Sequence, residues 1–203
     1  MFALVDKSDN SITRMYSGNK GITIGDNQYP KAIFSLWTEA ERNAINIYSV
    51  IIDDSKRKDV KWYINTDITY SFDGTNATGS YDDATAKAHA DTLFTEQDET
   101  DGLGTEGDVK TEGLKTILIR QVKNDAEREL NKTDWYVTRK AEKNTAIPSA
   151  ITTHRDAVRT KQASMETAIT NASDTPALET LYTYTRQENG STTRPLGEIP
   201  ELI

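Results

Sequence analysis

The sequence predicts an α+β fold: a small antiparallel β domain with a covering helix, then a C-terminal helical hairpin or three-helix module and an extended tail. Two observations lead to this prediction. Short apolar runs separated by turn-forming Asp, Asn and Gly fill the first part of the chain, which is typical of strands and hairpins. From Leu114 onward, apolar residues instead recur at helical spacing.

Composition narrows the class of protein. A chain of 203 residues with 35% hydrophobic and 28% charged residues can bury a core. It contains no cysteine, which excludes disulfides, thiolate metal sites and cysteine nucleophiles. No apolar run approaches the roughly 18 residues of a membrane span. The first residues, M-F-A-L-V-D, lack the basic segment of a cleavable signal peptide, so we expect synthesis and folding in the cytoplasm.

The first domain is predicted to be mostly antiparallel. Phe2–Val5 and Ile12–Tyr16 should form a hairpin, and Thr38 with Glu41 fits a capping box that begins a short helix. We expect Asp82 or Asp83 to cap another helix that runs to about Phe94. The remaining strands are predicted at Tyr48–Ile52, Trp62–Ile64, Ile68–Phe72 and Ala77–Tyr81.

An acidic segment then suggests a domain boundary. Residues 96–112 contain seven acidic residues and one lysine, with almost nothing to bury. The predicted organisation is therefore a domain at 1–95, a linker at 96–113, a helical module at 114–189 and a tail at 190–203. The G-L-G-T-E-G run at 102–107 matches a dinucleotide-binding pattern but follows no buried strand, and the carboxylates lack calcium-loop spacing.

The helical module has recognisable starting signals. One helix is predicted from Leu114 to Leu130, Thr133 should cap a second through Lys143, and Pro148 suits the first turn of a third. Asp174-Thr175-Pro176 should begin a short helix that ends at Asn189-Gly190. The third helix carries a narrow stripe that either packs on the two preceding helices or mediates self-association: Ile151, Val158, Met165 and Ala172.

Charge and chemistry exclude several functions. Residues 115–170 carry 11 basic and 7 acidic side chains inside a chain of net charge −8, too small an excess for a typical nucleic-acid binder. His89 and His154 have no metal-type partner one helical turn away, and no nucleophile-elbow or P-loop motif occurs. We therefore expect no enzyme, no cofactor, no metal and no membrane or nucleic-acid partner.

Two groups of residues are candidates for a protein interface. The first combines aromatic rings with planar cations, a composition enriched in interfaces: Trp135, Tyr136, Arg139, Arg155 and Arg159. An internal role is the alternative, with Trp135 filling the hairpin core and Arg155 or Arg159 pairing with Asp134 or Glu142. The second group lies in the tail and needs an apolar surface to cover it: Leu196, Ile199, Leu202 and Ile203.

The order of residues in 130–169 also resembles a known module. Thr133-Asp134-Trp135, then Arg139, Ile147-Pro148, Arg155 and Arg159, is similar to the C-terminal module of bacteriophage tail assembly chaperones and tail-fibre-associated proteins. The early A-L-V strand and the Y-P segment before an aromatic helix are a looser likeness. Unlike the simplest chaperones, this chain adds a complete β domain.

The resemblance implies a function in phage assembly. It implies a structural or adaptor protein of the virion tail, made in the host cytoplasm, with other tail or tail-fibre proteins as partners and a homo-oligomer as a further option. The alternative is a tail or tail-fibre assembly chaperone that does not remain in the mature virion.

Overall fold

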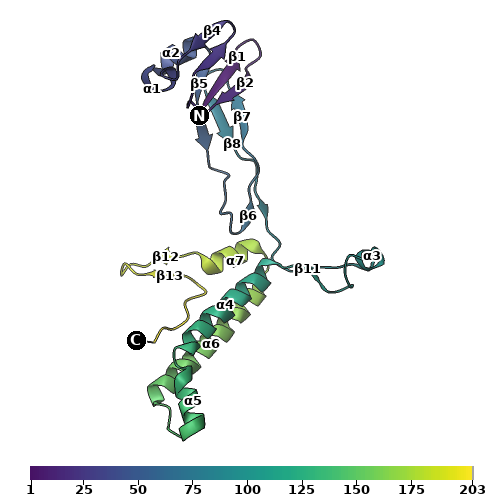
Figure 1. Ribbon diagram of the computed structural model, residues 1–203, viewed down its shortest axis with the longest axis vertical. Coiled ribbons are helices and arrows are strands. Elements are labelled where there is room, and N and C mark those ends of the chain that lie inside the picture. Colours follow the sequence, from purple (N-terminus) through teal and green to yellow (C-terminus); the bar gives the residue numbers. More distant parts are fainter. Residues whose placement is uncertain (203) are drawn as a thin grey trace. The chain divides into compact units, whose positions relative to one another are not determined.

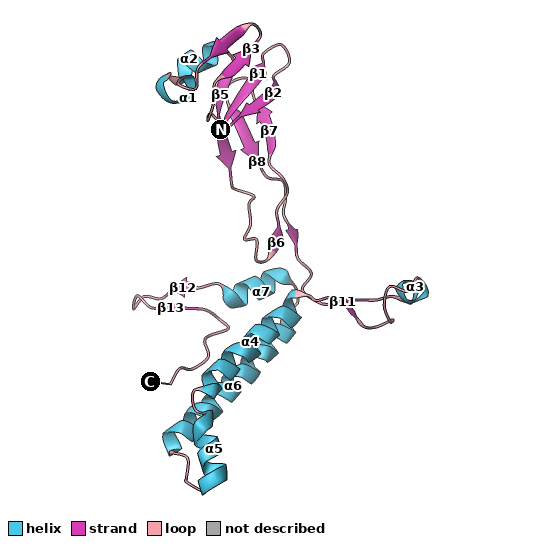
Figure 2. Cartoon of the chain, viewed as in Figure 1, coloured by secondary structure: helices cyan, strands magenta, loops and turns pink. Residues whose placement is uncertain are grey.

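A computed structural model describes residues 1–202 and confirms the α+β class (Figures 1 and 2). The chain forms two compact units, one spanning Met1–Thr85 and the other beginning at Ala86. The division therefore falls before the acidic segment that the sequence suggested as the linker. Each unit has its own buried side chains and is described separately.

The first unit is built on a five-stranded sheet of order β2-β1-β5-β8-β7. Neighbouring strands are antiparallel except β5 and β8, which run parallel. The edge strands β2 and β7 also contact each other, so the sheet curls toward closure. The strand bounds are β1 (Phe2–Asp6), β2 (Ser11–Tyr16), β5 (Ile47–Asp53), β7 (Thr69–Phe72) and β8 (Ala77–Ser80).

The two faces of this sheet bury different clusters, because side chains alternate along β1. Ala3 and Val5 pack with Phe72 on one face. Phe2 and Leu4 pack on the other with the elements that cover it. The predicted capping box of Thr38 and Glu41 is confirmed at the start of α2. The covering elements are β3 (Ile22–Ile24), β4 (Asn27–Tyr29), α1 (Ile33–Leu36) and α2 (Glu39–Ala44).

The helix predicted up to Phe94 is wrong. The structure has two short strands there, β9 (Thr85–Ala86) and β10 (Thr92–Leu93). The backbone carbonyls of residues 88 and 89 accept hydrogen bonds from the first N–H groups of the next long helix, and the Asp91 carboxylate accepts one from Gly113 N–H at 2.6 Å. Capping this distant helix uses the backbone groups that a local helix would have paired internally.

The predicted linker contains secondary structure instead. Helix α3 (Glu96–Thr100) begins with a capping box between Thr95 and Asp98, and β11 (Val109–Thr111) pairs antiparallel with β10. We call this hairpin with its terminal helix, residues 92–111, the acidic arm. In Figure 2 the arm leaves the start of the long helices as a narrow projection.

The helical module forms the core of the second unit. Helix α4 (Leu114–Asn131) packs antiparallel on α6 (Ser149–Asn171), and α5 (Asp134–Lys143) connects them. The stripe predicted on the third helix is buried inside the chain, with Val158 and Ile169 fully enclosed. Packing on the preceding helices therefore accounts for it.

The last segment departs from the prediction at one point. Helix α7 (Thr175–Tyr182) begins as expected, with the Asp174 carboxylate accepting a hydrogen bond from Ala177 N–H. It ends well before Asn189-Gly190, because that dipeptide forms the turn of a small hairpin. The hairpin consists of β12 (Thr185–Arg186) and β13 (Thr192–Thr193), with Gly190 at φ +83°. An irregular tail follows.

The junction at Gly113 gives a first prediction. A Cβ at this position would lie 2.3 Å from the backbone carbon and oxygen of Ala90. We expect Gly113→Ala to lower the free energy of unfolding of the second unit by about 1–3 kcal/mol, because backbone has to move. Chemical denaturation measures it. Thr111→Ala, an exposed neighbour, is the control and should change stability by less than about 0.5 kcal/mol; equal effects would contradict the prediction.

Candidate protein-binding site

A buried arginine connects the three helices at one end of the module. Arg155, on α6, is only 8% exposed. Its Nη1 lies 2.8 Å from the carbonyl oxygen of Leu130, 2.7 Å from Thr133 Oγ1 and 2.8 Å from Asp134 Oδ1. We call these four residues the arginine clamp. It ties the end of α4 and the start of α5 to α6.

The position of the clamp follows from helix chemistry. The last carbonyls of α4 have no partner within that helix, and Leu130 O is one of those that Arg155 satisfies. Thr133 occupies the N-cap position of α5, as predicted, but its side chain does not cap that helix. Its hydroxyl instead donates to Leu130 O at 2.9 Å and accepts from Arg155.

Helix α5 presents an aromatic and cationic face to solvent. The rings of Trp135 and Tyr136 lie 3.7 Å apart between centroids. The Arg139 guanidinium lies over both rings, at 4.8 Å and 5.3 Å. Trp135 is 52% exposed, and no residue of α5 is buried. We call Trp135, Tyr136 and Arg139, together with Lys140 and Lys143 on the same side of the helix, the α5 face.

The prediction that Trp135 fills the hairpin core is therefore wrong. Trp135 and Tyr136 are consecutive, so they project about 100° apart on a helix and both rings cannot enter one helix–helix seam. The clamp holds Thr133 and Asp134 toward α6 and leaves the two rings outside. The α4–α6 interface is filled by aliphatic side chains instead.

The two remaining arginine candidates have different positions. Arg155 is internal and paired with Asp134, which confirms the arginine part of the internal alternative but not its placement of Trp135. Arg159 is exposed on α6 and pairs with Asp156 on the same helix at 3.2 Å. Trp135, Tyr136 and Arg139 are thus brought together, whereas Arg155 supports them from below and Arg159 is separate.

The C-terminal tail lies on its own unit. Leu196 is buried, and its carbonyl oxygen accepts a hydrogen bond from Lys161 Nζ at 2.7 Å. Ile199 is half-buried and Leu202 is 40% exposed. Ile203 lies outside the described residues. A neighbouring protein is not needed to cover most of the tail, contrary to the expectation.

Glu129 fastens the end of this tail and was not singled out from the sequence. Its side chain is almost fully buried, accepts a hydrogen bond from Leu202 N–H at 2.8 Å, and lies 3.2 Å from His154 Nε2. Burial would raise the pKa of Glu129, but hydrogen bonds from Lys132 and Leu202 outweigh it and the pKa is lowered. The His154 side chain is only 9% exposed and packs within this cluster. The signal in the sequence that could have identified Glu129 is its position on a face of α4 whose other buried residues are apolar.

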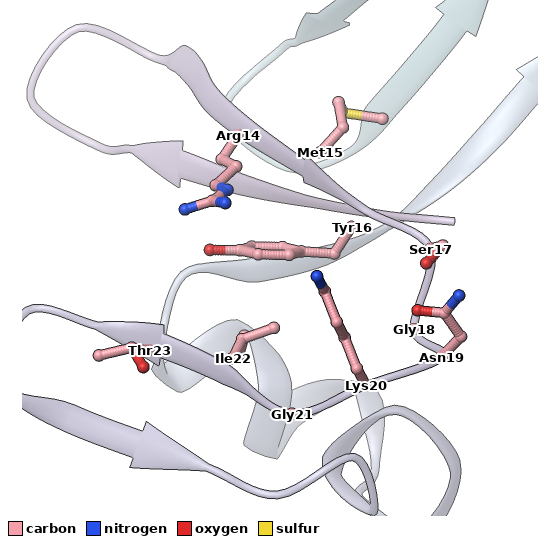
Figure 3. Close-up of a pocket in the computed structure, with 10 residues that line it drawn as sticks. All are labelled: Arg14, Met15, Tyr16, Ser17, Gly18, Asn19, Lys20, Gly21, Ile22 and Thr23. Carbon is pink, nitrogen blue, oxygen red and sulfur yellow. The ribbon is translucent and has the colours of Figure 1, made fainter.

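The first unit contains a hollow that is a candidate small-molecule site. Its volume is about 420 Å³, and one stretch, residues 14–23, lines it (Figure 3). The Arg14 guanidinium lies 5.5 Å from the Tyr16 ring, and Figure 3 shows the Lys20 side chain pointing toward that ring. The lining contains two cations and no carboxylate, so it offers no acid–base pair. We assign it no function.

Two general features complete the description. Within residues 1–202, no three metal-ligating side chains come together. None of the helices in that range is both long and apolar enough to cross a membrane.

Comparison of the chain with protein-family models, curated proteins and solved structures finds no match. The resemblance of the motif in 130–169 to phage tail proteins therefore stays a prediction.

The arginine clamp predicts a contrast between two arginines on one helix. We expect Arg155→Ala to destabilise the second unit by about 2–4 kcal/mol, because Leu130 O and the Thr133 hydroxyl lose a buried partner. Arg159→Ala, which removes an exposed pair, should cost less than about 0.5 kcal/mol. Urea denaturation followed by circular dichroism measures both. Similar values for the two variants would show that the clamp is not structural.

The tail contact predicts a pH dependence. Because the folded pKa of Glu129 is lowered, the stabilisation is present above its ordinary value of 4.5 and is lost as pH falls through the folded value. We expect the Leu202 amide to exchange its hydrogen faster at pH 4 than the intrinsic rate change predicts. Glu129→Ala, which removes the acceptor, should show fast exchange already at pH 7. Glu127→Ala, an exposed control, should match the wild type; protection retained in Glu129→Ala would contradict this contact.

Proposed function

We propose that this chain is a non-enzymatic structural or adaptor protein of a bacteriophage tail that binds its neighbours through the α5 face. The observation that carries the binding function is a half-exposed tryptophan stacked on a tyrosine and an arginine, on a helix with no buried residue. Trp, Tyr and Arg are the residues that dominate binding energy in protein interfaces.

The rigidity of this face supports the proposal. A helix of ten residues is marginal in isolation. Here the arginine clamp fixes its first turn, and Asn144, in the left-handed region at φ +53°, ends it. A face that is already ordered loses less conformational entropy on binding. The two buried charged side chains of the module, Arg155 and Glu129, both hold segments of the chain together through hydrogen bonds.

The phage setting is supported by the motif in 130–169, and the structure gives its residues distinct positions. Thr133, Asp134 and Arg155 make the clamp, whereas Trp135 and Arg139 lie outside it. A motif in which one half builds a support and the other half projects from it supports a docking role in assembly. An assembly chaperone that leaves the finished particle would use the same face and is the second candidate.

The copy number in particles tests the proposal. We expect gradient-purified virions to contain this protein at a fixed stoichiometry, measured by quantitative mass spectrometry against a tail protein of known copy number. Trp135→Ala should fold with a melting temperature within about 2 °C of the wild type, because the ring is half exposed, yet be depleted from particles at least about tenfold.

A matched variant and the contrary outcomes complete this test. Leu36→Ala removes another exposed large side chain, in the first unit, and should be incorporated normally. Abundance in lysate with absence from particles would favour the chaperone. Normal incorporation of Trp135→Ala would remove the α5 face from the proposal.

A further inference from the structure

The acidic arm is an ordered projection rather than a flexible loop. Its two strands pair, and the Thr95–Asp98 capping box begins its helix. A Cβ at Gly104 would lie 2.6 Å from the Phe94 ring, so the ring packs directly against that glycine. Hydrogen bonds from Lys110 and from Thr95 lower the pKa of Asp98 to about 2, and this carboxylate thus stays charged within the arm.

The surface of the arm combines negative charge with apolar side chains. Residues 92–111 contain six carboxylates and one lysine, and no residue in this range is buried. Three large apolar side chains are exposed on it: Leu93, Leu103 and Val109. Three carboxylates of the arm make no capping hydrogen bond and no ion pair among the described contacts: Glu96, Glu106 and Asp108. Like the α5 face, this surface stays uncovered in the isolated chain.

The α5 face is complementary to the arm in both respects. Its exposed Trp135 ring and half-buried Tyr136 ring can cover apolar side chains, and Arg139, Lys140 and Lys143 supply positive charge on the same side. Of the two carboxylates of α5, Asp134 is turned to Arg155. An acidic surface that also carries aliphatic side chains is the kind of partner that such a face fits.

The two surfaces lie at opposite ends of α4. The arm precedes its first residue and α5 follows its last, and 18 helical residues span about 27 Å. Figure 1 shows the arm leading away from the α4–α6 pair, and Trp135 remains exposed. Within one copy, the arm therefore leaves the α5 face open.

We propose that the acidic arm of one copy binds the α5 face of a second copy, so that the protein assembles head to tail. This inference rests on the proposed binding role of the α5 face and names its partner. Because the two surfaces differ, the contact is heterologous, and repeating it gives a closed ring or an open chain. Each added copy leaves one free face and one free arm until the ring closes.

Charge reversal on each surface tests the contact with the full chain. The first variant is Lys140→Glu with Lys143→Glu, and the second is Glu106→Lys with Asp108→Lys. Analytical ultracentrifugation should show the wild type associating with rising concentration, and less so at high salt. Each variant alone loses most of the charge complementarity between the two surfaces, so we expect its association to weaken at least about tenfold. Mixing the two variants should restore association.

Controls carry the same charge changes elsewhere. Lys31→Glu with Arg186→Glu matches the first variant, and Asp26→Lys with Glu188→Lys matches the second; all four side chains are exposed. Both controls should associate as the wild type does, and circular dichroism checks that every variant is folded. A wild type that is monomeric at every concentration would overturn the proposal, as would undiminished association of Glu106→Lys with Asp108→Lys.

The test of the head-to-tail contact and the test of the proposed function can fail independently. If the chain is monomeric but Trp135→Ala is still lost from particles, the head-to-tail contact is wrong and the adaptor function stands. If the mixed variants restore association but purified particles lack the protein, the contact stands and the adaptor function is wrong.

Discussion

A guanidinium enclosed between helices holds the helical module of this protein together. A buried cation is tolerated only where acceptors surround it, and Arg155 has three, all from the segment that joins α4 to α5. One of these contacts is to the helix-end carbonyl of Leu130, which also accepts hydrogen bonds from the N–H and the hydroxyl of Thr133. One side chain therefore closes the helix pair and sets the direction in which α5 leaves it.

That direction explains the exposed aromatic residues. Leaving a large ring half in water forgoes a part of the roughly 1.5–3 kcal/mol that burial would contribute. Stacking of Trp135 on Tyr136 and Arg139 recovers some of it within the helix. Binding of a partner would supply the rest of this burial free energy. The clamp keeps the rings in one arrangement before any partner binds. Stability of the module and exposure of the site thus have the same cause.

Local signals in the sequence predicted those elements whose backbone groups are hydrogen-bonded by side chains close by in the sequence. The capping box at Thr38 and the start of α7 after Asp174 are of this kind. The helix predicted before Phe94 does not form, because the backbone groups of this segment pair with an element further along the chain. Its carbonyls and the Asp91 carboxylate cap α4, and that pairing depends on where the chain has folded, which spacing along the sequence does not encode.

For the candidate site, composition singled out these residues but did not predict which of them are buried supports and which lie at the surface. Arg139 and Arg155 have the same chemistry, yet one lies over exposed rings and the other beneath them. The consecutive positions of Trp135 and Tyr136 held the missing information. Consecutive residues leave a helix about 100° apart, so at least one of the two had to point away from the core, and Thr133-Asp134 just before them offered acceptors for a buried cation. Once Arg155 is assigned to that pair, both rings and Arg139 are directed outward together, and the motif is read as a support followed by a contact surface.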